Sequence, residues 1–96
     1  MTRIGTFQTA HASKYMQQLL KHFAHKVEVR YDDTQGHAAM PLGPAEFRAS
    51  DAALTITVSA ADDAGLEMAM AVIDDHLVRF AFREGFEKMD WATSVP

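Results

Sequence analysis

The chain has 96 residues, enough for one domain spanning positions 1–96 and too few for a large enclosed cavity. It contains no cysteine, which excludes disulfides, thiolate metal sites and cysteine nucleophiles. Its formal net charge of −4 disfavours nucleic acid as a partner. No apolar run approaches the roughly 18 residues of a membrane span, and no apolar leader opens the sequence, so a cytoplasmic location is expected.

The N-terminal quarter predicts a strand followed by a helix. Residues 3–9 have the character of a short strand. Residues 10–25 carry apolar side chains at spacings of three and four, which is typical of an amphipathic helix. Thr9 is expected to be its N-cap. The apolar stripe consists of Ala12, Tyr15, Met16, Leu19, Leu20 and Phe23.

The middle of the chain predicts three or four antiparallel strands in a meander. Apolar and polar residues alternate over 27–31, 45–49 and 54–58, as expected for strands with one solvated face. Residues 32–36 are a polar turn candidate. A short strand is expected at 38–42, confined by its prolines to an edge or a bend.

The last third predicts a second helix and a final strand. Asp62 or Asp63 caps the helix, which is expected to run to about Arg83 and to stop before Gly85. Asp74 and its neighbour Asp75 are expected on its solvated face. Residues 86–92 then resemble a strand. The buried stripe of the helix consists of Leu66, Ala69, Met70, Ile73, Leu77, Phe80 and Ala81.

This order of elements predicts an α+β fold. Two helices with one apolar face each, beside half-solvated strands, favour a two-layer sandwich with both helices on one face of a mostly antiparallel sheet. The topology is loosely ferredoxin-like. The least exposed side chains should include Leu19, Phe23, Leu54, Ile56, Val58, Ile73, Leu77 and Phe80.

Two histidines near the end of the first helix are a candidate metal site. His22 and His25 are three residues apart, so they lie on the same side of a helix. A divalent cation would need a third ligand from elsewhere. His76 borders the stripe of the second helix and could face the first helix. Local hydrogen bonding is the alternative role for all three imidazoles.

The second helix also carries a cationic row that consists of His76, Arg79 and Arg83. Guanidinium groups one turn apart suit a carboxylate or a phosphate, so this row is a candidate site for a small anionic ligand. The alternative is pairing with acids of the same chain. At least one of the two arginines is expected to contact a carboxylate or a backbone carbonyl within the protomer.

An apolar pair lies away from the main stripe of the second helix. Val78 and Phe82 are four residues apart, and a helix that is apolar on a second side is covered either by a loop or by a partner. The interpretation we favour is a homodimer contact through these two residues.

Two segments resemble a small bacterial family of domains of unknown function, whose members are about this long. They are Asp75–Glu84, followed by Asp90-Trp91, and Tyr15–Lys26. The resemblance spans essentially the whole chain. The matching residues are His22, His25, Lys26, His76, Arg79, Phe80, Arg83 and Glu84.

The resemblance implies two functions. Some members are encoded beside siderophore-interacting proteins, which implies a binding or accessory domain in iron or siderophore handling. Others are labelled as a dihydroxyheptenedioate aldolase, which implies a metal- or lysine-dependent lyase. The barrel of a metal-dependent aldolase takes about 250 residues, far more than this chain has. A Schiff-base mechanism needs an enclosed lysine, and Lys26 is the candidate. We therefore favour the binding domain over the enzyme.

Overall fold

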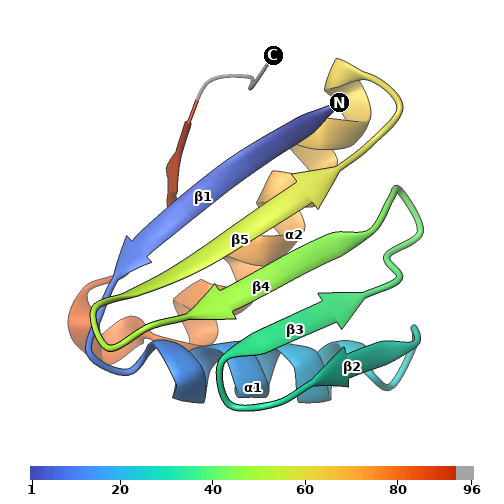
Figure 1. Cartoon of the computed structure of the whole chain (residues 1–96). Coiled ribbons are helices and arrows are strands. Elements are labelled where there is room, and N and C mark those ends of the chain that lie inside the picture. The colour runs from blue at the N-terminus through green and yellow to red at the C-terminus, as the bar shows by residue number, and fades with distance from the viewer. Residues whose placement is uncertain (93–96) are drawn as a thin grey trace.

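The alternating segments form one six-stranded antiparallel sheet in the computed structural model, which describes residues 1–92 (Figure 1). The strand order is β2-β3-β4-β5-β1-β6. The strands are β1 (Thr2–Gln8), β2 (Val29–Tyr31), β3 (Gln35–Ala38), β4 (Ala45–Ala49), β5 (Ala53–Ser59) and β6 (Asp90–Trp91).

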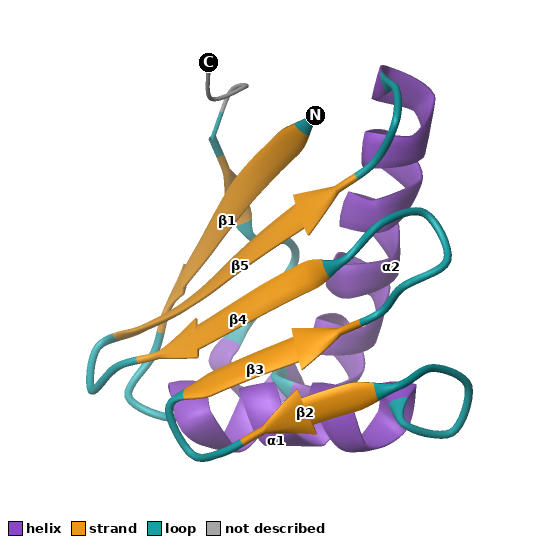
Figure 2. Ribbon diagram, turned by 45° about the vertical axis from the view of Figure 1, so that its right-hand side comes forward, coloured by secondary structure: helices purple, strands orange, loops and turns teal. Residues whose placement is uncertain are grey.

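Both α-helices cover the same face of this sheet. The helix α1 (Ala12–Phe23) lies beneath β2 to β5, and α2 (Asp63–Phe80) packs on β5 and against α1. A short 3₁₀ turn, η1 (Phe82–Glu84), follows α2. The two views show the helices together on one side of the strands (Figures 1 and 2). The predicted two-layer α+β sandwich is therefore confirmed.

The topology contains a ferredoxin-like unit. The sheet neighbours β6-β1-β5-β4, joined through α1 and α2, follow the split β-α-β pattern. The hairpin of β2 and β3 is inserted after α1 and extends the sheet beyond β4. This insertion makes the match to the ferredoxin-like topology a loose one, as expected from the sequence.

The core lies between the sheet and the two helices. Seven of the eight side chains predicted to be least exposed are buried, and Leu19, Leu54, Ile56 and Leu77 are fully enclosed. Phe80 is the exception, since it is only half-buried and borders the core. Within residues 1–92, neither helix has the length and apolar character that crossing a membrane requires.

The N-cap assignment of Thr9 is wrong. The helix α1 begins at Ala12, and its N-cap His11 makes no side-chain capping bond. The Thr9 hydroxyl instead accepts the backbone N–H of His11 at 3.0 Å and donates to Glu84 Oε2 at 3.0 Å. Thr9 therefore ties the start of α1 to the end of the second helical region.

The strand predicted at residues 38–42 is shifted toward the N-terminus. The strand β3 covers Gln35–Ala38, and only Asp32 to Thr34 form the turn. Asp32 Oδ1 accepts the backbone N–H groups of Thr34 and Gln35, both at 2.8 Å, which lowers the pKa of Asp32. Gly36 belongs to the strand, where it pairs with Tyr31 of β2 and Phe47 of β4, and its missing side chain leaves room for Leu20 of α1, since a Cβ there would lie 2.3 Å from Leu20 Cδ1.

The C-terminal elements are shorter than predicted. The helix α2 is capped by the Asp62 side chain, as expected, but ends at Phe80 rather than near Arg83. Gly85 closes η1 with φ at 70°, a left-handed conformation that glycine adopts at little cost. Of the predicted strand over residues 86–92, only Asp90 and Trp91 form a strand, and the other residues are irregular.

Candidate functional site

The end of α1 and the facing side of α2 enclose a cavity lined by histidines. Its volume is about 390 Å³. The loop between β3 and β4 forms its third wall. The lining residues are His22, Phe23, His25, Lys26, Val27, Met40, Pro41, Val72 and His76.

Three imidazoles line this cavity, one from α1, one from the turn that follows α1 and one from α2. The ring centroids of His22 and His76 are 4.6 Å apart, and those of His22 and His25 are 6.4 Å apart. His76 Nδ1 lies 2.6 Å from the Val72 carbonyl oxygen, so it donates its proton there. Its Nε2 is left without a proton in the neutral ring and can accept a proton or a hydrogen bond.

The electrostatics of this end favour negative charge. The pKa of His22 is held below its ordinary value of 6.5. The first cause is partial desolvation, and the second is the positive charge of His76, His25, Arg79 and Lys26. The lining of the cavity includes no aspartate or glutamate. An anion placed here would relieve the repulsion among these groups.

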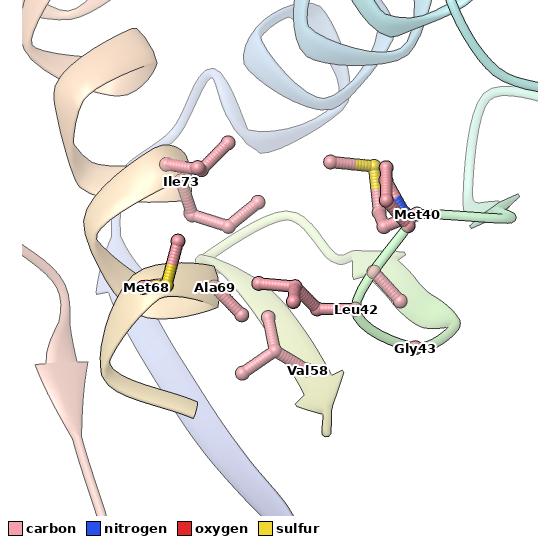
Figure 3. A pocket seen from close by; sticks show the side chains of 10 residues that line it. Met40, Leu42, Gly43, Val58, Met68, Ala69 and Ile73 are labelled. Atoms are coloured by element: carbon pink, nitrogen blue, oxygen red, sulfur yellow. The ribbon is translucent and has the colours of Figure 1, made fainter. Parts of the chain in front are cut away.

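A second cavity continues from the first toward the N-terminal half of α2. Its volume is about 300 Å³, and apolar side chains from α2, β4, β5 and the β3–β4 loop enclose it (Figure 3). Both cavities are lined by Met40, Pro41 and Val72, so they adjoin, and we call the two cavities together the groove. The other lining residues are Leu42, Gly43, Ala45, Val58, Met68, Ala69 and Ile73.

The loop wall of the groove is held in place by Gly43. Its φ of 152° and its close approach to β5 both require glycine, since a Cβ would lie 2.5 Å from the Ser59 carbonyl oxygen. On the rim, the Leu42 side chain from the loop is 41% exposed and the Met68 side chain from α2 is 60% exposed. The groove is therefore open to solvent along an apolar rim.

The cationic row predicted on the second helix divides in the structure. His76 lines the groove, and Arg79 is close enough for its charge to act on His22. Arg83 instead lies over the Phe82 ring, with its guanidinium carbon 5.6 Å from the ring centroid. No side-chain hydrogen bond or ion pair within residues 1–92 involves Arg79 or Arg83, so the predicted internal contact is absent there.

The histidines do not form a complete metal site on their own. Across the described part of the chain, no group of three or more His, Asp or Glu side chains is arranged to hold a metal ion. His22 and His25 both border the groove, where they remain available to a ligand that enters it.

Sequence reasoning missed the apolar half of the groove. The sequence predicts a strand over residues 38–42, but residues 39–44 are the loop that forms one wall. The pattern of Pro41, Gly43 and Pro44 around Met40 and Leu42 was the available signal, because it is typical of a loop that exposes apolar side chains.

Comparison with known proteins identifies relatives over nearly the whole chain. Residues 5–92 match the family model described as "Uncharacterized protein conserved in bacteria (DUF2218)". The NMR structure of PA4090 from Pseudomonas aeruginosa is 25% identical, with a TM-score of 0.79 over 99% of this chain and 98% of that one. No curated protein matches the chain.

Proposed function

The chain belongs to the DUF2218 family of uncharacterised proteins conserved in bacteria, and we propose that it binds a small organic anion in the groove between α1, α2 and the β3–β4 loop. The site holds the anionic group at the histidine end. The role is one of binding rather than catalysis.

One observation carries this proposal: three imidazoles and an ammonium line a cavity that has no acidic residue in its lining. The three imidazoles are those of His22, His25 and His76, and the ammonium is that of Lys26. Desolvation first, and then neighbouring positive charges, lower the pKa of His22, and a bound anion would offset the second of these causes. Perturbed titratable groups in a cavity are typical of binding sites.

The family resemblance supplies a cellular context for this binding. Iron or siderophore handling in the cytoplasm would employ a domain that binds an organic chelator or one of its acidic building blocks, and both are organic anions. This context is part of the proposal, and it is supported by the resemblance rather than by any contact of the groove. We also propose that the protein forms a homodimer through Val78 and Phe82.

A lyase is the alternative, because Lys26 lines the groove. Schiff-base chemistry depends on a desolvated lysine, and Lys26 is exposed. The metal-dependent variant would use His22 and His25, and metal at molar stoichiometry in the purified protein would support it. The exposure of Lys26 leads us to prefer simple binding.

Calorimetric titration with butyrate tests the proposal. We expect the wild-type protein to bind this anion at pH 6.5 and low ionic strength. Replacing Lys26 by glutamine should weaken binding about fivefold, which is the effect of removing one partly exposed ionic contact.

Lys88→Gln is the matched control, since it removes the same charge from an exposed lysine outside the groove. It should bind butyrate as the wild type does. If both variants bind butyrate equally weakly, the change in net charge explains the loss, and the proposal that the groove binds the anion is wrong.

A further inference from the structure

The groove continues from its charged end into an apolar channel, and this shape restricts the ligand class further. We propose, building on the function proposed above, that the ligand is a medium-chain aliphatic carboxylate. Its carboxylate lies among His22, His76 and Lys26, and its chain follows α2 toward Ala69 and Met68.

The apolar end explains why a simple inorganic anion is not the best fit. Its walls are methionine, leucine, valine, isoleucine, alanine and proline side chains from opposite sides, and they point toward one another (Figure 3). Water in such a channel finds few hydrogen-bonding partners. A methylene chain would displace that water and cover the exposed Leu42 and Met68.

The length of the channel sets the length of the chain. His76 and Ala69 are seven residues apart on α2, a distance of about 10 Å at the helical rise of 1.5 Å per residue. An extended chain advances about 1.1–1.2 Å per bond, judged from the extended polypeptide backbone. A carboxylate of about eight to ten carbons therefore spans the groove.

The dimensions of the groove favour a small molecule over a protein partner. Volumes of about 300 Å³ and about 390 Å³ in its two parts are of the size that small ligands occupy. The combination of one cationic end and one apolar end is complementary to an amphipathic acid. The β3–β4 loop, with Gly43 at its close approach to Ser59, forms a wall of the cavity in the structure.

A chain-length series tests the inference. Butyrate, hexanoate, octanoate and decanoate are titrated calorimetrically below their micellar concentrations, with octanol as the uncharged probe. We expect the affinity to rise about two- to fourfold per methylene up to octanoate, as for partial to full burial of each CH₂. Octanol should bind at least tenfold more weakly than octanoate.

Ala69→Phe should fill the channel and remove most of the gain in affinity from butyrate to octanoate. Ala71→Phe, on an exposed position of the same helix, is the control and should keep the dependence. NMR of the wild type gives a second measurement that needs no variant. Octanoate, but not butyrate, should shift the methyl signals of Leu42, Val58 and Met68.

The outcomes separate this inference from the proposed function. Butyrate binding with no gain from longer chains overturns the aliphatic ligand and leaves the anion site standing. Octanol binding as tightly as octanoate overturns both, because charge would then not be recognised. Absence of binding by every acid also overturns both.

Discussion

Two acidic side chains, Asp74 and Glu84, hold the C-terminal segment against the rest of the molecule. Asp74 Oδ1 accepts the Met89 N–H and Oδ2 accepts the Trp91 indole N–H, both at 2.9 Å. Asp74 is therefore not a member of the solvated face, where the sequence placed it beside Asp75. A carboxylate that bridges an indole and a buried backbone amide is a structural clamp.

Glu84 forms the second clamp through its contacts with α1 and the preceding turn. The Tyr15 hydroxyl and the Thr9 hydroxyl both donate to Glu84 Oε2. The hydrogen bond to Glu84 raises the pKa of Tyr15 to about 12 and holds the pKa of Glu84 below its ordinary value. The Tyr15 contribution to stability is therefore present below pH 10 and is lost between about pH 10 and 12.

Replacing Asp74 by alanine should destabilise the protein by about 1–3 kcal/mol, since it leaves the buried amide of Met89 without its acceptor. Chemical denaturation measures this change, and the emission of Trp91 should shift to the red because the indole, no longer held by the carboxylate, becomes more exposed to water. Asp75→Ala, on the exposed side of α2, should change stability by less than about 0.5 kcal/mol. Equal effects of the two substitutions would refute the clamp.

At the scale of elements, α2 presents three different faces. One face contributes Ile73 and Leu77 to the core, and another lines the groove. The third face exposes Val78, whose side chain is 39% exposed, and leads to Phe82 in η1, which is 63% exposed. The sequence predicts that either a loop or a partner covers this pair. No loop within residues 1–92 buries it, so a partner is the alternative that we test.

We predict that the protein is a homodimer at micromolar concentration through this pair. Phe82→Asp places a charge in the contact and should shift the native mass from dimer to monomer. Native mass spectrometry measures the change, with Met68→Asp on the groove rim as the comparison variant that should remain dimeric. A wild-type protein that is already monomeric would contradict the prediction.

The sequence predicted the elements where a local pattern determines them and failed where tertiary contacts do. Alternating β-branched residues specified β5, and the apolar stripe specified the buried face of α1. The polar residues before Gly36 predict a turn where β3 begins, because the packing of Leu20 against Gly36 is a tertiary contact that no local pattern shows. The helix α2 also ends before the predicted position near Arg83, and beyond its end Glu84 accepts a hydrogen bond from Tyr15 of α1, a tertiary contact that no local pattern shows.

For the molecule as a whole, the inserted hairpin creates the site. The strands β2 and β3 extend the ferredoxin-like sheet, and the connection from β3 back to β4 forms the loop that faces α2 (Figure 2). Helical spacing predicts only that His22 and His25 lie near one another, whereas the position of His76 beside them depends on the packing of α2 against α1. The apolar half of the groove depends on a loop and a helix that are far apart in sequence, so no local pattern could predict it.

The pKa of the His22 imidazole, followed by NMR with and without saturating butyrate, tests the anion site most directly. In the free protein the account predicts a pKa below 6.5, because the ring is partly desolvated and the charges of His76, His25, Arg79 and Lys26 oppose protonation. Bound carboxylate should raise that pKa, and by linkage butyrate affinity should increase as the pH falls and His22 becomes protonated in the complex. A His22 pKa that is unchanged by butyrate, with an affinity independent of pH, would contradict the account.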